Sequence, residues 1–219
     1  MNLARNMTVS AILLGAFAIT GTGLLALTHQ ATRERIAQNE RELLLRTLNE
    51  LVPGTERDND PYSDITQVLE PGALGSDKPV TVYRARKEGQ PVAAIINAVA
   101  PDGYSGRIGL LVAVRYDGTL AGVRVTAHRE TPGLGDAIET SRSDWILGFD
   151  DKSLDNPRPR GWRVKRDGGE FDQFTGATVT PRAIVRAVFN TLRYFESNRE
   201  AMFAPAQGGQ EPGETIDDA

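Results

Sequence analysis

An unbroken apolar segment near the amino terminus constrains this chain more than any other feature. Residues 6–32 contain no Asp, Glu, Lys or Arg, and Val9–Leu27 form their apolar centre. About 20 apolar residues suffice to cross the hydrocarbon core of a membrane as a helix. A cleaved signal peptide is the alternative, but this segment is longer than a typical signal-peptide core and no clear A-x-A site follows it. We therefore expect one transmembrane helix at residues 9–28, after a short segment at residues 1–8.

A helical pattern continues beyond the apolar segment. Apolar residues recur at three- and four-residue steps as far as Leu51, and Pro53-Gly54 then ends the pattern. The sequence predicts a helical stalk at residues 29–54, with the recurring apolar positions Ile36, Leu43, Leu44, Leu48 and Leu51. Arg5 precedes the span and Arg33 follows it, so the count of Lys and Arg does not decide which side of the membrane the stalk enters.

Composition excludes several classes of protein and site. The chain has 219 residues, of which 40% are hydrophobic and 25% are charged, enough for one domain with a packed core. Its net charge of −4 argues against a general role in nucleic-acid binding. With no cysteine and two histidines, it cannot form a disulfide, a thiolate metal site or a His-rich metal site. We expect no metal.

The region after the stalk has the pattern of an α+β domain, expected at residues 55–200. Residues 55–77 form a loop with one short strand near Ile65–Leu69. Short runs rich in Val and Ile then alternate with Gly and Asp turns, which predicts an antiparallel meander. Its four strands are "VTVYRA", "PVAAIINAVA", "RIGLLVAV" and "LAGVRVTA".

Helices and loops are expected to flank this sheet. A glycine-rich loop, "HRETPGLGD", leads into an expected helix at Ala137–Leu147, with Trp145 and Ile146 facing inward. Asn156–Gly169 reads as an irregular segment whose cations form a solvated face. The final helix should start near Pro181 and bury Ile184, Val188, Leu192 and Phe195. Residues 201–219 lack apolar periodicity and are expected to be a disordered tail.

Three threonines, at 175, 178 and 180, crowd the entry to this final helix. Thr180 precedes Pro181, so it is the expected N-cap. Thr178 lies in the preceding turn beside Gly176 and Ala177. A phosphate ester there would lie beside the positive end of the helix dipole, and Gly176 would let a bulky group approach the backbone. By spacing alone, capping and turn roles are favoured over a cofactor site.

Three motifs add a family resemblance. "DQFTGAT", Asp172–Thr178, resembles the flavinylation motif D-x-x-(S/T)-G-A-T, and "HRETPGLG", His128–Gly135, resembles the flavin loop of the same FMN-binding domain. "APDGYSG", Ala100–Gly106, resembles a third segment of it. The motif order, the single span and the chain length resemble the G subunit of the Rnf electron-transport complex. The C subunit of the sodium-pumping NADH:quinone oxidoreductase is a related family.

The resemblance implies a covalent cofactor. A flavin transferase would join FMN to Thr178 through a phosphodiester, and Asp172 would serve recognition by the transferase or orientation of the loop. No catalytic residue is implied, and His128 is expected to have a structural role at a strand end. The implied cofactor-binding residues are Thr178, Thr175, Gly176, Ala177, Asp172, Glu130, Thr131, Gly133, Leu134, Gly135 and Tyr104.

The resemblance also implies a function and a location. The chain would be a flavoprotein subunit of a complex in the bacterial inner membrane that couples electron transfer to ion translocation, with its soluble domain in the periplasm. Its partners would be the other subunits, and it would not oxidise NADH by itself. The alternative is a cofactor-free, membrane-anchored assembly or sensing module with an FMN-binding-type fold, in which Thr178 is only a turn residue.

Overall fold

The structure divides the chain into two compact units. The computed structural model describes the backbone of residues 2–204 and the side chains of residues 5–33 and 35–204. The boundary between the units lies between Arg46 and Thr47. Residues 205–219, which form most of the expected tail, lie outside the described residues.

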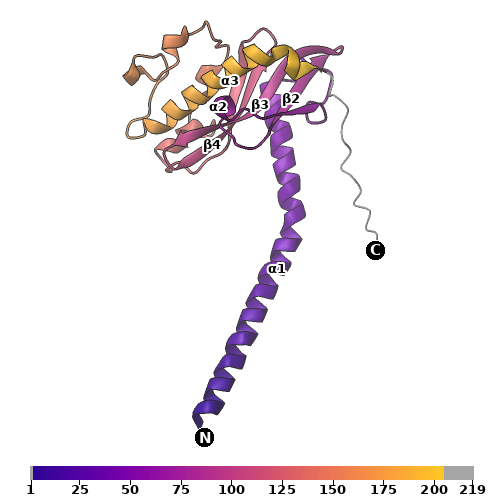
Figure 1. The fold of residues 1–219 in the computed structure, drawn as a ribbon, viewed down its shortest axis with the longest axis vertical. Coiled ribbons are helices and arrows are strands. Elements are labelled where there is room, and N and C mark those ends of the chain that lie inside the picture. Colours follow the sequence, from indigo (N-terminus) through magenta and orange to yellow (C-terminus); the bar gives the residue numbers. More distant parts are fainter. Residues whose placement is uncertain (1, 205–219) are drawn as a thin grey trace. The chain divides into compact units, whose positions relative to one another are not determined.

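The first unit is helical. Helix α1 runs without interruption over Asn2–Leu51 and ends two residues before Pro53, as the sequence predicts (Figure 1). Among the described residues, α1 is the one helix that is long and apolar enough to cross a membrane. The large apolar side chains of its expected transmembrane segment, residues 9–28, are exposed, Phe17 to 77% and Ile19 to 76%, which suits contact with lipid.

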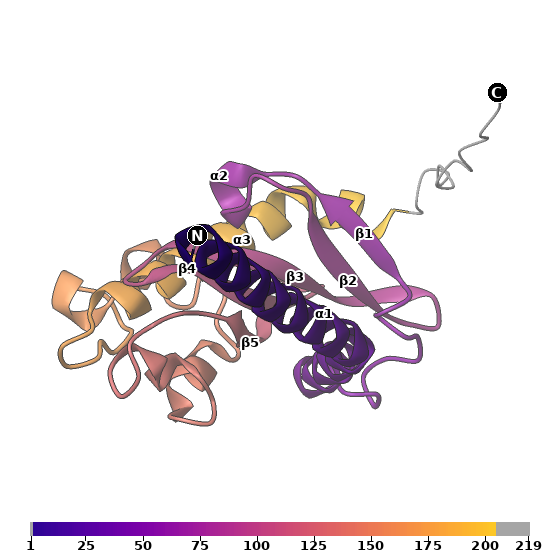
Figure 2. The same ribbon diagram turned by 90° about the horizontal axis from the view of Figure 1, so that it is seen from below.

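The second unit is built on one antiparallel sheet. The strand order is β1-β2-β3-β4-β5, which follows the sequence, and the strands lie side by side in Figure 2. This confirms the predicted meander and the α+β class. The strands are β1 (Ile65–Val68), β2 (Val80–Lys87), β3 (Gln90–Gly103), β4 (Gly106–Arg115) and β5 (Leu120–Ala127).

The hairpin formed by β3 and β4 has the longest pairing. Its register runs from Ala93 opposite Arg115 to Gly103 opposite Gly106. The two loop residues between these glycines are Tyr104 and Ser105. Gly106 has a φ of +117°, in the region that favours glycine. The hairpin therefore ends in a tight loop whose backbone N–H groups are free to bond another segment.

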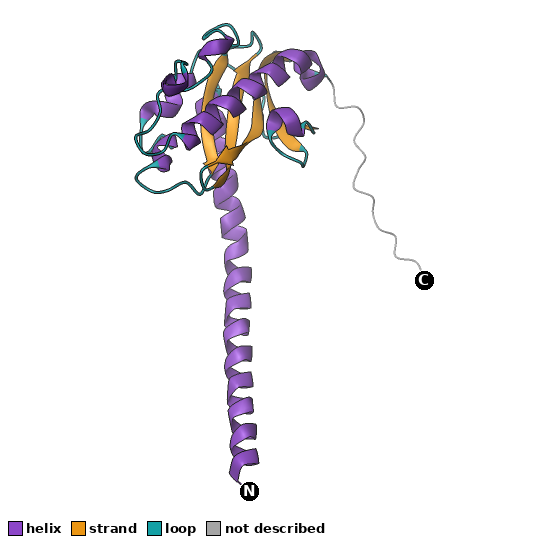
Figure 3. Cartoon of the chain, turned by 60° about the vertical axis from the view of Figure 1, so that its left-hand side comes forward, coloured by secondary structure: helices purple, strands orange, loops and turns teal. Residues whose placement is uncertain are grey.

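Helix α3 (Val179–Phe203) covers one face of the sheet, with the short helix α2 (Pro71–Leu74) beside it (Figures 1 and 3). Its predicted core face is confirmed, because its four apolar residues are at most 1% exposed: Ile184, Val188, Leu192 and Phe195. Leu48, Leu51 and Val52, at and just after the end of α1, are buried as well.

Two predictions differ from the structure: the helix expected at Ala137–Leu147 and the end of the final helix. Ala137–Leu147 is not one helix but two 3-10 turns, η1 (Gly135–Ile138) and η2 (Asp144–Phe149). The hydroxyl of Ser143 donates to Ala137 O at 2.6 Å and accepts from Trp145 N at 3.2 Å, so it starts a new turn. Ile146 is buried, as expected, and Trp145 is half-buried against the core.

The basic segment also contains two short turns, η3 (Pro159–Gly161) and η4 (Lys165–Asp167), and its cations are exposed as expected. Helix α3 continues to Phe203 and buries Met202 and Phe203, which the sequence placed in the tail.

A charged clamp from β2 explains this helix end. Arg84 Nη1 donates to Ala204 O at 2.8 Å, and Arg86 Nη2 donates to Phe203 O at 2.9 Å. Cations at a helix C-terminus satisfy its last carbonyls and the negative end of its dipole. Asp64 binds both arginines, at 2.5 Å to Arg84 and 2.8 Å to Arg86, and Arg84 is only 6% exposed.

Asp64→Ala should therefore destabilise the domain strongly. It leaves a buried guanidinium without its carboxylate, which costs about 3–5 kcal/mol. Guanidinium unfolding of the detergent-solubilised chain, followed by tryptophan fluorescence, measures this cost, because Trp145 and Trp162 both lie in the domain. Asp77→Ala, at an exposed position, is the control. An equal effect of the two variants would contradict the clamp.

Candidate functional site

The buried carboxylate of Glu130 joins three segments of the domain. Its Oε1 accepts from Ser105 N at 2.9 Å and its Oε2 accepts from Tyr104 N at 3.3 Å, both in the loop of the β3–β4 hairpin. Oε2 also accepts from the hydroxyl of Thr180, in the first turn of α3. Glu130 is 4% exposed. This one side chain thus fixes the hairpin loop, the glycine-rich loop and the start of α3 against one another.

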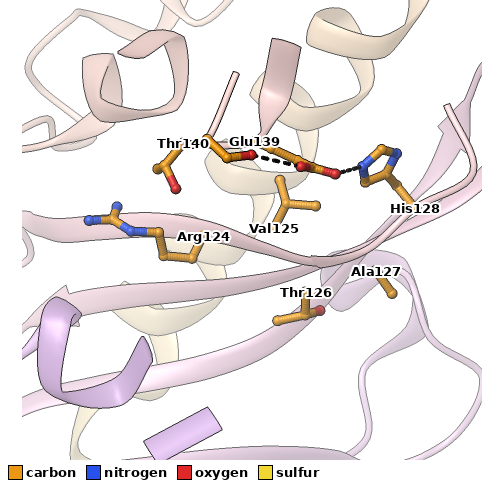
Figure 4. Close-up of a pocket in the computed structure, with 8 residues that line it drawn as sticks. Arg124, Val125, Thr126, Ala127, His128, Glu139 and Thr140 are labelled. Atoms are coloured by element: carbon orange, nitrogen blue, oxygen red, sulfur yellow. Dashed lines mark hydrogen bonds and ion pairs between the residues drawn. The ribbon is translucent and has the colours of Figure 1, made fainter. Parts of the chain in front are cut away.

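The glycine-rich loop is held at both ends. Glu130 N donates to His128 Nδ1 at 3.1 Å, so the proton of a neutral His128 is on Nε2, which lies 2.6 Å from Glu139 Oε1 (Figure 4). His128, which follows the end of β5, thus bonds both the glycine-rich loop and Glu139. Thr131 O accepts from the N–H groups of Leu134 and Gly135 at 3.1 and 3.0 Å. These bonds close a tight turn that leaves Leu134 46% exposed.

The loop before α3 is also fixed from outside. Trp145 Nε1 donates to Asp172 O at 2.8 Å, while the exposed Asp172 carboxylate lies 2.6 Å from Lys165 Nζ. A β-turn follows, closed by a bond from Ala177 N to Phe174 O at 3.1 Å. Gly176, inside that turn, has a φ of +82°, a conformation that favours glycine.

The three threonines have different environments. Thr180 was expected to cap α3, and that prediction is wrong: α3 starts at Val179, its N-cap is Thr178, and Thr180 is fully buried with its hydroxyl donating to Glu130. Thr175 is exposed in the β-turn. Thr178 is half-buried, and its hydroxyl makes no capping hydrogen bond. Only Thr178 combines a position at the helix N-terminus with an uncommitted capping hydroxyl.

A cavity of about 240 Å³ lies where the three segments meet. It brings together seven of the residues singled out from the sequence, together with Thr180, which the sequence did not assign to the site. It is lined by Tyr104, Glu130, Thr131, Leu134, Gly135, Gly176, Ala177 and Thr180. Four further candidates, Asp172, Thr175, Thr178 and Gly133, do not line it, although Thr178 directly follows the lining residue Ala177.

A second cavity, of about 390 Å³, lies beside the end of β5 (Figure 4). Arg124–His128 line one side of it and Glu139–Ser141 line the other, and none of the candidate cofactor-binding residues contributes. The hydrogen bond from His128 holds the pKa of Glu139 below its usual range, and the hydroxyl of Ser141 acts in the same direction. The charged form of Glu139 is thus favoured by folding.

Glu139→Gln should make the free energy of unfolding fall less steeply as the pH is lowered. Because the pKa of Glu139 is lower in the folded chain, its contribution is present above the ordinary glutamate pKa of about 4.3 and is lost as the pH falls through the folded value. Guanidinium unfolding midpoints between neutral and acid pH measure this slope, with the exposed Glu170→Gln as control. An acid slope of Glu139→Gln equal to that of the unsubstituted chain would contradict this role.

Gly135→Ala should destabilise the domain where the glycine-rich loop packs against the start of α3. A Cβ at this position would lie 2.8 Å from Glu130 Cβ and 3.2 Å from Thr180 Oγ1. Overpacking of this kind costs about 1–3 kcal/mol. The same unfolding measurement tests it against Gly148→Ala, where a Cβ would meet nothing within 4 Å. Equal stability of the two variants would show that the contact between Gly135, Glu130 and Thr180 tolerates an added side chain.

Two family models match the chain. Residues 103–193 match the FMN-binding domain, and residues 1–51 match the RnfG N-terminal region. The first of these ranges contains all the residues that line the smaller cavity.

Three bacterial proteins, each named as the G subunit of an ion-translocating oxidoreductase complex, are similar over nearly the whole chain. The one from Pseudomonas aeruginosa is 55% identical, over 93% of this chain and 95% of its own. Those of Pseudoalteromonas atlantica and Vibrio cholerae are 50% and 44% identical, over 88% and 87% of this chain and 90% and 91% of theirs. The crystal structure of Shewanella oneidensis NqrC is 24% identical, with a TM-score of 0.45, and covers 62% of this chain and 70% of its own. From the similarity to the three bacterial proteins, the chain belongs to the family of G subunits of the ion-translocating oxidoreductase complex.

Proposed function

We propose that this chain is the flavoprotein subunit that relays electrons within a membrane-bound, ion-translocating complex, through FMN attached to Thr178. The observation that carries the proposal is the meeting of three distant segments at one cavity immediately before that threonine. FMN supplies the exchange of one or two electrons, while the protein sets its position and environment. The similarity to subunits of ion-translocating complexes supports the role within a larger assembly.

The cavity fits part of an FMN molecule. Leu134, Ala177 and the ring of Tyr104 offer apolar surface, and Thr131 and Gly135 add polar groups around it. Its 240 Å³ is below the roughly 300–1,000 Å³ of pockets that enclose a whole drug-sized ligand. The remainder of the flavin would therefore be exposed. An exposed flavin can exchange electrons with a partner at close range, but it is weakly retained, and a covalent tether offsets that weakness.

The environment of Thr178 supports it as the attachment residue. Its side chain is half-buried at the N-terminus of a 25-residue helix, where the N–H groups of Val179 and Thr180 precede Pro181. These donors and the helix dipole favour a phosphate. The hydroxyl of Thr180, by contrast, is buried and bonded to Glu130.

We propose that a flavin transferase carries out the attachment with FAD as donor. Thr178 Oγ forms a bond to the phosphorus on the riboflavin side while the pyrophosphate P–O bond breaks. AMP leaves, and the hydroxyl proton passes to a base of the transferase. The side chain of Asp172 is 68% exposed, whereas its carbonyl is fixed by Trp145, so it can present a recognition carboxylate from a rigid loop.

The site of attachment predicts an ordered set of variants. After co-expression with the flavin transferase, the intact mass should increase by FMN less one water. Thr178→Val should abolish this gain because it removes the nucleophilic oxygen. Thr175→Val and Thr180→Val should retain most of it. Full modification of Thr178→Val would show that another hydroxyl carries the flavin, and an unmodified parent chain would favour the cofactor-free module.

We further propose that the domain after α1 lies in the periplasm, which rests on the family resemblance. Because the chain has no cysteine, a single introduced cysteine is the only thiol in it that a maleimide can label. Asp77→Cys, at an exposed position in the domain, should react with a membrane-impermeant maleimide in intact spheroplasts. The parent chain is the unlabelled control. Labelling only after lysis would place the domain on the cytoplasmic side.

A further inference from the structure

Glu130 is a buried carboxylate without a cationic partner. Within the described part of the chain, Glu130 takes part in no ion pair, because no Lys or Arg lies within ion-pair distance of its carboxylate. Its oxygens accept instead from two backbone N–H groups and one hydroxyl. These are three donors, which match an ionised carboxylate with its two acceptor oxygens.

The charge of Glu130 is compensated by dipoles. Two N–H groups of the hairpin loop and the N-terminal end of α3 stabilise it where a buried charge would otherwise be costly. Dipoles leave the net charge of the site at minus one, whereas an arginine would have cancelled it. Since Glu130 is 4% exposed and lines the cavity, water screens its field only weakly there.

We propose that Glu130, beyond joining the three segments, lowers the reduction potential of the flavin held in this cavity. This inference rests on the proposed function. A fixed negative charge opposes the arrival of an electron on any group beside it, so bound FMN would be harder to reduce and a stronger donor to the next carrier. Thr180 moderates the effect, because its hydroxyl donates to Glu130 and spreads part of the charge.

Two substitutions should move the potential in opposite directions. Glu130→Gln keeps the shape and an acceptor oxygen but removes the charge, so the midpoint potential should rise. Thr180→Val keeps the charge but removes a donor, so the potential should fall. A role confined to holding the loops together would not give shifts of opposite sign.

Glu139→Gln is the matched control. It removes the same charge from a carboxylate whose side chain is 41% exposed and which lines the other cavity, so its shift should be much smaller. The full-length holoprotein, purified in detergent after co-expression with the transferase, would be titrated spectrophotometrically against redox dyes, with covalent flavin content measured first.

The outcomes separate the two claims. A parent chain without flavin would sink the proposed function, and this inference with it. Flavin present, with a Glu130→Gln shift no larger than that of Glu139→Gln, would overturn the tuning role alone. If Glu130→Gln fails to retain flavin, the Thr180→Val variant provides the test instead. A midpoint potential of Thr180→Val that equals or exceeds that of the parent chain would also overturn the tuning role.

Discussion

The carboxylate of Glu130 is the contact on which the geometry of the site depends. It bonds the tip of the β3–β4 hairpin and the first turn of α3, and its own backbone N–H bonds His128. The hairpin tip and the helix start lie 25 or more residues from Glu130 in sequence, and both supply part of the cavity lining together with the glycine-rich loop. This side chain therefore helps to set both the position of the helix N-terminus, next to Thr178, and the electrostatics of the cavity.

The size of the cavity links the structure to the proposed chemistry. A cavity of about 240 Å³ is too small to enclose a whole flavin, so it would leave part of the cofactor accessible to a partner and would offer less surface to hold a free ligand. A phosphodiester at the adjacent helix N-terminus would resolve this conflict, because the tether is covalent and the helix dipole stabilises its charge. The apolar segment of α1 would keep such a domain at the membrane, where a second carrier can reach it.

Sequence reasoning predicted much of the fold, because local patterns determine it. Short runs rich in Val and Ile, separated by turns, predicted the meander, and apolar residues at helical spacing predicted the buried face of α3. The partner of Thr180 could not be predicted, since Glu130 lies 50 residues earlier and only the tertiary fold brings them together. The same limit explains the missed break at Ser143, where side-chain bonds end one turn and start another, and the end of α3, which arginines from β2 determine.

The identity of the esterified residue tests the account most directly. Cleavage after Arg166 and Arg182 releases one peptide that contains all three candidate threonines. Tandem mass spectrometry of this peptide, from protein purified out of its native membrane, should place the flavin phosphate on Thr178. Flavin on Thr175 or Thr180, or a peptide without flavin, would contradict the account.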